Sequence, residues 1–367
     1  MLSFRWSMPL LLACTCAVPA AAQDLRGGEL RLNPHDAGFQ LTGDVATGGN
    51  GDFVAVWFEA FASPPQLFVK ARLFAADGRA KGGDIEVARL PRVPSSAPRV
   101  AADAAGRFTV VWTSPSATTG GSAQVFGRRF DSLGRTIGPR FAVRPSHHDE
   151  IDPDVAMTAD GRAVIGWSEF TGRFDPEDVE IQQIAFRRMT AAGAFVGPAV
   201  RSHDGELPRV AVRGDGGFAI ASQIYGFESS FYDIFLSLYG ADGTRRRETF
   251  EVNTGENVVV SQFDPAIAMA ADGRMFVTWT DSGGDGSEPG VTFADIQGVA
   301  GQLLAEDGTP LGDNVRINRF WRGRQEASTV AATPSGGFLV AWQSGANQDG
   351  DGTGIFERQF AADGRRL

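Results

Sequence analysis

The stretch 51–57, GDFVAVW, decides the fold, because a short apolar run closing at the same phase recurs along the whole chain. Successive runs are 55, 55, 55, 57 and 63 residues apart. A period of this size is typical of stacked supersecondary units. The closing positions are Trp57, Trp112, Trp167, Ser222, Trp279 and Trp342.

Each unit also carries small residues at fixed places before its closing position. A glycine stands six residues upstream and indicates a hairpin turn that needs a positive φ. An alanine stands eleven residues upstream, always after Val or Ile, and indicates an innermost strand beside a crowded axis. The runs themselves are apolar on both faces, and two further strands follow, so each unit is predicted to be a four-stranded antiparallel meander.

One such meander cannot bury two apolar faces, so neighbouring meanders must stack. Radial stacking predicts an all-β fold, a six-bladed β-propeller of four-stranded antiparallel blades, with an open β-solenoid as the alternative. The last unit ends after its third strand, while the segment 28–33, GELRLN, matches a fourth strand. We therefore expect this N-terminal strand to complete the sixth blade and close the ring.

Residues 1–22 are expected to form a signal peptide that is cleaved before Gln23, leaving 23–367 as a single propeller domain. The apolar core of this leader is too short to span a bilayer, so the protein is expected to be exported, periplasmic or extracellular, and not membrane-spanning. Lipoprotein anchoring at Cys14 is the less favoured alternative. Both cysteines, Cys14 and Cys16, lie in the leader, so stability must come from a core without disulfides.

The chain is acidic, with a formal net charge of −10. This charge argues against nucleic acid and anionic membranes as partners, because their phosphates would be repelled. All cationic side chains except Lys70 and Lys81 are arginine. We attribute that bias to codon usage before function.

The pattern resembles the propeller-type repeats of bacterial extracellular proteins, in which a unit has the form D-G-x-F-V-V-W, then R-x-F-D-x-x-G, then F-x-V-N. The segments 336–342, 128–134 and 250–253 carry the resemblance, which covers essentially the whole chain after the leader. Unit four departs from it, with Ser222 in place of Trp and Ser237 in place of Arg. The resemblance implies a scaffold and brings no activity with it.

All four histidines lie in the segments that lead into innermost strands, and three are followed by aspartate. His148 and His203 are one repeat of 55 residues apart, so we expect them at equivalent places near the mouth of the channel. Imidazoles and carboxylates there could hold a divalent metal or act as an acid and base. The favoured alternative is a set of capped turns and ordinary surface residues. The candidates are His35, Asp36, His147, His148, Asp149, Glu150, His203 and Asp204.

A calcium site is a second candidate, at Asn347, Asp349 and Asp351. Alternating oxygen ligands followed by glycine suit the first half of a calcium loop, but its twelfth position is Arg358 in place of a bidentate glutamate. A solvated turn is the alternative. Ca²⁺ is the one cofactor that the sequence suggests.

Charges alternate thirteen residues before the closing position of the first four units. These residues are Asp44, Arg99, Asp154 and Arg209. Neighbouring innermost strands would then present opposite charges. We expect an inter-blade ion-pair ring with a structural role, and a polar channel lining is the alternative.

Long connections between strands gather on one rim, where aromatic residues such as Tyr225, Phe227 and Trp321 could stack on sugars or a peptide. The leading hypothesis is therefore a binding module that presents this rim and the central funnel to a protein, peptide or glycan. The alternative is a propeller hydrolase or lyase acting on an extracellular polysaccharide, with the His148-Asp149 and His203-Asp204 pairs as its acid, base or metal set. A structural envelope component is the third possibility.

Overall fold

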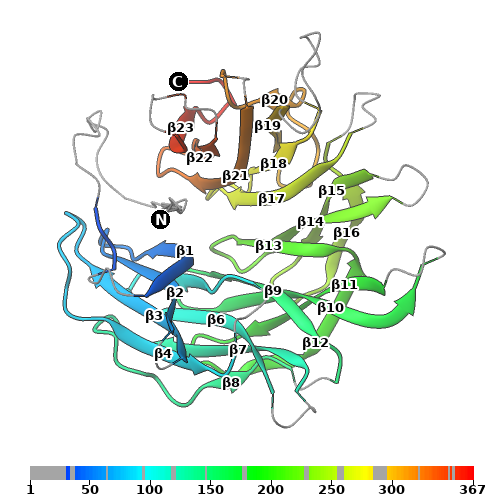
Figure 1. Ribbon diagram of the computed structural model, residues 1–367. Coiled ribbons are helices and arrows are strands. Elements are labelled where there is room, and N and C mark those ends of the chain that lie inside the picture. The colour runs from blue at the N-terminus through cyan, green and yellow to red at the C-terminus, as the bar shows by residue number, and fades with distance from the viewer. Residues whose placement is uncertain are drawn as a thin grey trace.

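The computed structural model shows an all-β protein, and no described residue lies in a helix (Figure 1). It follows that no helix in the described part of the chain could cross a bilayer. The structure describes residues 30–33, 38–62, 65–92, 96–116, 121–144, 147–175, 180–226, 231–253, 260–283, 296–320, 323–345, 348 and 352–367.

The strands follow the sequence repeat unit by unit. Unit one comprises β1 (Phe39–Thr47), β2 (Phe53–Ala62), β3 (Pro65–Phe74) and β4 (Ile85–Leu90). Unit two comprises β5 (Arg99–Ala102), β6 (Phe108–Pro115), β7 (Ala123–Phe130) and β8 (Phe141–Ala142). Unit three comprises β9 (Glu150–Met157), β10 (Ala163–Phe174), β11 (Glu180–Met189) and β12 (Phe195–Asp204).

Units four and five repeat this order, and unit six has three strands in the described part of the chain. Unit four comprises β13 (Glu206–Val212), β14 (Phe218–Gly226), β15 (Phe231–Tyr239) and β16 (Arg245–Glu251). Unit five comprises β17 (Gln262–Met269), β18 (Met275–Asp281), β19 (Ile296–Leu304) and β20 (Val315–Arg316). Unit six comprises β21 (Gly323–Ala332), β22 (Phe338–Ser344) and β23 (Gly354–Phe360).

Units one to four each form a separate four-stranded sheet in chain order, as predicted. Units five and six share one sheet, because β19 also makes a short parallel pairing with β21. The strands β1, β9, β13, β17 and β21 lie on the inner side of the arrangement (Figure 1).

The repeated tryptophans build the cores between successive units. Trp112 of unit two packs with Val56 and Val69 of unit one, and Trp279 of unit five packs with Leu236 of unit four. Each such contact removes apolar surface of both sheets from water, at about 25 cal/mol per Å². Burial of both faces thus explains why the runs are apolar at every position.

Arginine side chains add polar links between neighbouring units. On the turn rim, Arg107 donates to the Asp160 carbonyl at 3.2 Å and Arg162 donates to the Asp215 carbonyl at 3.0 Å. The planar guanidinium has five N–H donors and reaches a neighbouring backbone while keeping its charge near water. The arginine bias therefore has a structural role that codon usage does not describe.

The N-terminal segment lies beside unit one. Leu32 packs against Trp57 and Phe74, and its carbonyl accepts a hydrogen bond from Arg72 at 3.4 Å. Arg128 in the third strand of unit two makes the same kind of bond, at 2.9 Å, to Val87 in the fourth strand of unit one.

Leu32 therefore occupies, relative to unit one, the place of a preceding unit's fourth strand. The described residues 30–33 are nevertheless not in a strand and do not pair with β23. The predicted strand at 28–33 is not seen in its described part, and ring closure and the number of blades stay predictions.

We expect removal of 23–33 to lower the melting temperature and to promote aggregation, because it uncovers Trp57 and leaves a sheet edge unprotected. A gentler change, Leu32→Ser, is expected to cost about 1.5 kcal/mol through lost apolar burial. Arg31→Ser, at an exposed neighbour, is the matched control and should leave the thermal melt almost unchanged. An unaltered melting temperature in both the deletion and Leu32→Ser would rule out a closing role for this segment.

Candidate functional site

Several predicted site residues lie outside the described residues: His35, Asp36, Phe227, Trp321, Asn347, Asp349 and Asp351. The calcium loop therefore stays a prediction. Within the described part of the chain, no group of three or more His, Cys, Asp or Glu side chains is gathered closely enough to hold a metal.

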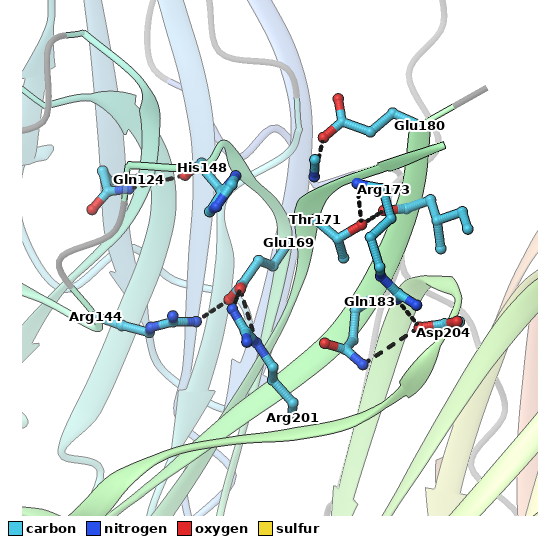
Figure 2. Close-up of polar contacts among 12 residues, drawn as sticks. Gln124, Arg144, His148, Glu169, Thr171, Arg173, Glu180, Gln183, Arg201 and Asp204 are labelled. Atoms are coloured by element: carbon cyan, nitrogen blue, oxygen red, sulfur yellow. Dashed lines mark hydrogen bonds and ion pairs between the residues drawn. The ribbon is translucent and has the colours of Figure 1, made fainter. Parts of the chain in front are cut away.

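His147, His148 and Asp149 are exposed residues in the turn that leads into β9. Asp149 accepts a hydrogen bond from the Ala123 amide at 2.6 Å, and the His148 carbonyl accepts one from Gln124 at 3.3 Å (Figure 2). These bonds tie the turn to β7 of the preceding unit. The arrangement agrees with the favoured alternative, a capped surface turn.

Glu150 is fully buried at the start of β9, where its carboxylate accepts a hydrogen bond from the Val125 amide at 3.1 Å. In units four and five the backbone amide equivalent to that of Val125 donates to an asparagine side chain, Asn253 or Asn318, at the end of the fourth strand. Unit two has Arg144 at that place, so Glu150 supplies the missing acceptor.

Glu150 lies in a buried cluster of charged side chains from units two and three. Glu169 lies directly opposite on β10 and is bound by Arg144 and Arg201 (Figure 2). Burial raises the pKa of Glu150 to about 8, the Val125 hydrogen bond and Arg144 oppose the rise, and Glu169 adds to it. Glu150 therefore belongs to the unit two to unit three contact.

His203 is half-buried near the end of β12 and reaches into unit four. Its Nε2 lies 2.7 Å from the Ser222 hydroxyl, and its Nδ1 lies 2.6 Å from the Ser202 hydroxyl and 3.2 Å from the Ser237 hydroxyl. Ser222 and Ser237 are the two departures of unit four from the repeat, and they make room for the imidazole.

His203 and His148 thus occupy different environments, which contradicts the predicted equivalence. The fourth strand of unit three runs on to Asp204, whereas that of unit two ends at Ala142. The sequence period could not reveal this difference in strand length. Burial and, to a smaller extent, Arg245 lower the pKa of His203 to about 4 against an opposing effect of Asp204, so the ring is neutral near pH 7.

A cavity of about 290 Å³ opens between units three and four, and we call it the 3–4 pocket. Two predicted site residues, Asp204 and Tyr225, line it. Its polar and aromatic lining consists of Asp175, Glu180, Gln182, Asp204, Glu206, Tyr225 and Tyr232.

Glu206 is the best-supported carboxylate of the 3–4 pocket. It accepts hydrogen bonds from Gln182 and Gln223, both at 3.1 Å, and one from Tyr232. Burial and the contact with Glu206 raise the pKa of the Tyr232 phenol. The Tyr232 ring also packs edge to face on Tyr225, with centroids 5.2 Å apart.

Asp204 is held at the rim of the pocket by a salt bridge. Arg173 lies 2.5 Å from its carboxylate, and Gln183 donates to the same oxygen at 3.4 Å (Figure 2). Both charged partners are about half exposed. This pair belongs to the surface of the site.

A second cavity, of about 240 Å³, lies among the innermost strands and is lined by the four alternating charges. Asp44 accepts a hydrogen bond from the Val100 amide at 2.9 Å, and Asp154 accepts one from the Val210 amide at 2.7 Å. Among the described contacts no salt bridge joins the four charges of the predicted ring, and backbone amides of the next unit donate to the two carboxylates instead. The alternative, a polar channel lining, agrees with the structure.

The mouth of this channel carries a repeated β-bulge fifteen residues before the closing position. Asp152, Leu207, Asp264 and Ala327 have φ between 50° and 54°, and each strand shifts register there. Such bulges re-aim side chains. A proline follows three of them, at Pro153, Pro208 and Pro265, and this fixed-phase signal could have located the bulges in the sequence.

Asp152 is a candidate site residue that the sequence reasoning did not identify. Burial raises its pKa to about 6, Arg209 and Arg99 oppose the rise, and Glu206 and Asp264 add to it. The influence of Glu206 links this residue to the 3–4 pocket, and Asp264 lines the channel. An acid with a raised pKa beside other carboxylates is a candidate for acid–base chemistry.

Comparison with known proteins gives the fold. No protein-family model and no curated protein matches the chain. Among solved structures, an α-L-arabinanase from Penicillium chrysogenum in complex with arabinobiose is 11% identical, with a TM-score of 0.54 over 95% of this chain and 98% of that one. A protein of unknown function from Dyadobacter fermentans is also 11% identical, with a TM-score of 0.53 over 89% and 96%.

A third structure, the GH93 α-L-arabinofuranosidase of Fusarium graminearum with arabinobiose, is 9% identical, with a TM-score of 0.50 over 89% of this chain and 96% of that one. At these identities the likeness shows the fold alone. The chain shares the β-propeller architecture of these glycoside hydrolases.

Proposed function

We propose that this protein is an extracellular propeller glycosidase that binds a polysaccharide in the 3–4 pocket and hydrolyses it at the adjoining channel mouth. The observation that carries the proposal is the repeated bulge that holds the carboxyls Asp152 and Asp264 at equivalent places, where burial, Glu206 and Asp264 raise the pKa of Asp152. The shared fold with an arabinanase and an arabinofuranosidase supports this reaction class. It favours hydrolysis over the leading hypothesis of a pure binding module.

Glycoside hydrolysis needs one carboxyl group that is protonated and one that is ionised. Asp152 retains its proton up to about pH 6 and serves as the general acid, giving that proton to the leaving glycosidic oxygen. Asp264 stands at the equivalent bulge of unit five and serves as the second carboxylate, which activates water or attacks the anomeric carbon. The cationic Arg209 interacts electrostatically with Asp264 and offsets part of the negative charge of this site.

The test is release of reducing sugar from a panel of extracellular polysaccharides by wild type and Asp152→Asn. Loss of the proton donor should lower kcat by about 100-fold or more, with KM little changed. The wild-type rate should fall as pH rises through about 6, because Asp152 loses its proton there. Asp77→Asn, the same change in a turn of unit one, is the control and should keep full activity.

Glycan binding without hydrolysis is the second candidate. The Tyr225 and Tyr232 rings and the pocket carboxylates are sufficient to bind a sugar whatever happens at Asp152. Binding by wild type with no sugar released from any polysaccharide would favour this candidate and reject the glycosidase.

A further inference from the structure

The 3–4 pocket presents an unbalanced set of charges. Four carboxylates line it, and none of the described residues that line it is lysine or arginine. Arg173, a cation at the rim, is already paired with Asp204. Glu180 accepts one hydrogen bond from the Gly172 amide, at 2.7 Å.

Two side-chain donors that line the pocket are already engaged with one of its carboxylates. Gln182 and Tyr232 both direct their hydrogens to Glu206. The other end of the Gln182 amide, Oε1, is buried and has no hydrogen-bond partner. A buried acceptor without a partner costs about 1–3 kcal/mol, and Gln182 lines the pocket, so a ligand donor that reached this oxygen would regain part of that energy.

The aromatic wall is suited to the same kind of ligand. Tyr225 and Tyr232 meet edge to face and line the cavity together. Their ring faces carry negative electrostatic potential and attract a cation as well as the C–H face of a sugar. An anionic ligand would meet like charge from the carboxylates, which costs several kcal/mol at a desolvated site.

We propose that the 3–4 pocket selects a sugar residue bearing a free amine, which is an ammonium group at neutral pH. This inference rests on the proposed function and narrows its substrate class to amine-bearing polysaccharides, such as deacetylated aminoglycans. Glu206 and Glu180 receive the ammonium group, the Gln182 amide oxygen accepts a hydroxyl or ammonium hydrogen, and the tyrosine rings cover the sugar. An N-acetylated sugar has no ammonium charge for the carboxylates to attract, and the negative charge of a uronic acid is repelled by them.

Calorimetric titration of the whole protein with matched oligosaccharides tests this selectivity. The probes are glucosamine and galactosamine oligomers, their fully N-acetylated forms and galacturonate oligomers. Free-amine oligomers should bind at least 10-fold more tightly than the N-acetylated forms. The ratio of the two affinities should fall when the salt concentration is raised from 50 to 300 mM, because salt screens the attraction between the carboxylates and the ammonium group. Galacturonate should show no binding.

Two variants locate the selectivity in the pocket. Glu206→Gln and Glu180→Gln should each weaken binding of the free-amine oligomers about 10-fold and leave the N-acetylated oligomers unaffected. Glu248→Gln, whose side chain is 93% exposed in unit four, removes the same charge elsewhere and should change nothing. Thermal melts of all three verify folding.

The results separate the two proposals. Equal binding of free-amine and N-acetylated oligomers, or unchanged selectivity in both pocket variants, overturns the amine inference while the glycosidase proposal stands. Failure of every glycan to bind overturns both.

Discussion

Replacing Ser222 by tryptophan, the residue that closes the other units, is expected to lower the free energy of unfolding by about 3 kcal/mol. The consensus residue should destabilise the protein because the space that an indole fills elsewhere is taken by His203. The Ser222 hydroxyl lies 2.7 Å from His203 Nε2, and Ser222 is completely buried. An indole there would displace the imidazole and leave the Ser202 and Ser237 hydroxyls without it.

The double variant makes this explanation specific. His203→Ala alone should cost about 1–3 kcal/mol, because it removes hydrogen bonds from buried hydroxyls. Together with Ser222→Trp it should cost less than the sum of the two single changes, because the indole then occupies the space of the imidazole. Urea unfolding of the four proteins gives the coupling energy.

A matched control is available in unit six. Ser344 is also completely buried, and Ser344→Trp should destabilise the protein to the same extent. His203→Ala should give it no relief, since the two sites are in different units. Strict additivity of Ser222→Trp and His203→Ala would contradict the exchange of imidazole for indole.

Features that depend on a few adjacent residues could be predicted from the sequence. The strands β2, β6, β10, β14, β18 and β22 coincide with the apolar runs, because burial on both faces leaves a local pattern. The turn glycines also agree, and Gly216, for example, has φ of 96°. Local steric requirements and the hydrophobic period were sufficient for this level of structure.

The candidate site could be predicted only in part, because its contacts join different units. Asp204 and Tyr225 were identified and line one pocket, but their common partner Glu206 is held by Gln182 and Gln223 from two sheets. Ser222 was identified as a departure from the period, whereas its partner His203 depends on how far β12 extends. Such pairings depend on how neighbouring sheets pack, and the pattern of residues along the sequence does not predict that packing.

Replacing Glu150 by glutamine is expected to remove a pH dependence from the stability of the protein. Burial raises the pKa of Glu150 from 4.5 to about 8, so the folded protein keeps a proton that the unfolded chain releases. The stability due to the protonated form is fully present below about pH 4.5 and is lost as pH rises toward 8.

Glutamine keeps an acceptor for the Val125 amide and carries no charge, so Glu150→Gln should match wild type at pH 4.5 and exceed it by about 4 kcal/mol at pH 8. Denaturant unfolding across this range measures the difference. Glu248→Gln is the exposed control and should follow the wild-type pH dependence. Parallel pH profiles for wild type and Glu150→Gln would mean that Glu150 is ionised in the folded state, and that Arg144 outweighs the cost of burial. Arg144 also binds Glu169, so Glu169→Gln frees Arg144 to interact with Glu150. If Glu150 is protonated in the folded wild type, this variant should lose stability at a lower pH than wild type does. If Glu150 is already ionised, the pH dependence of stability should not change.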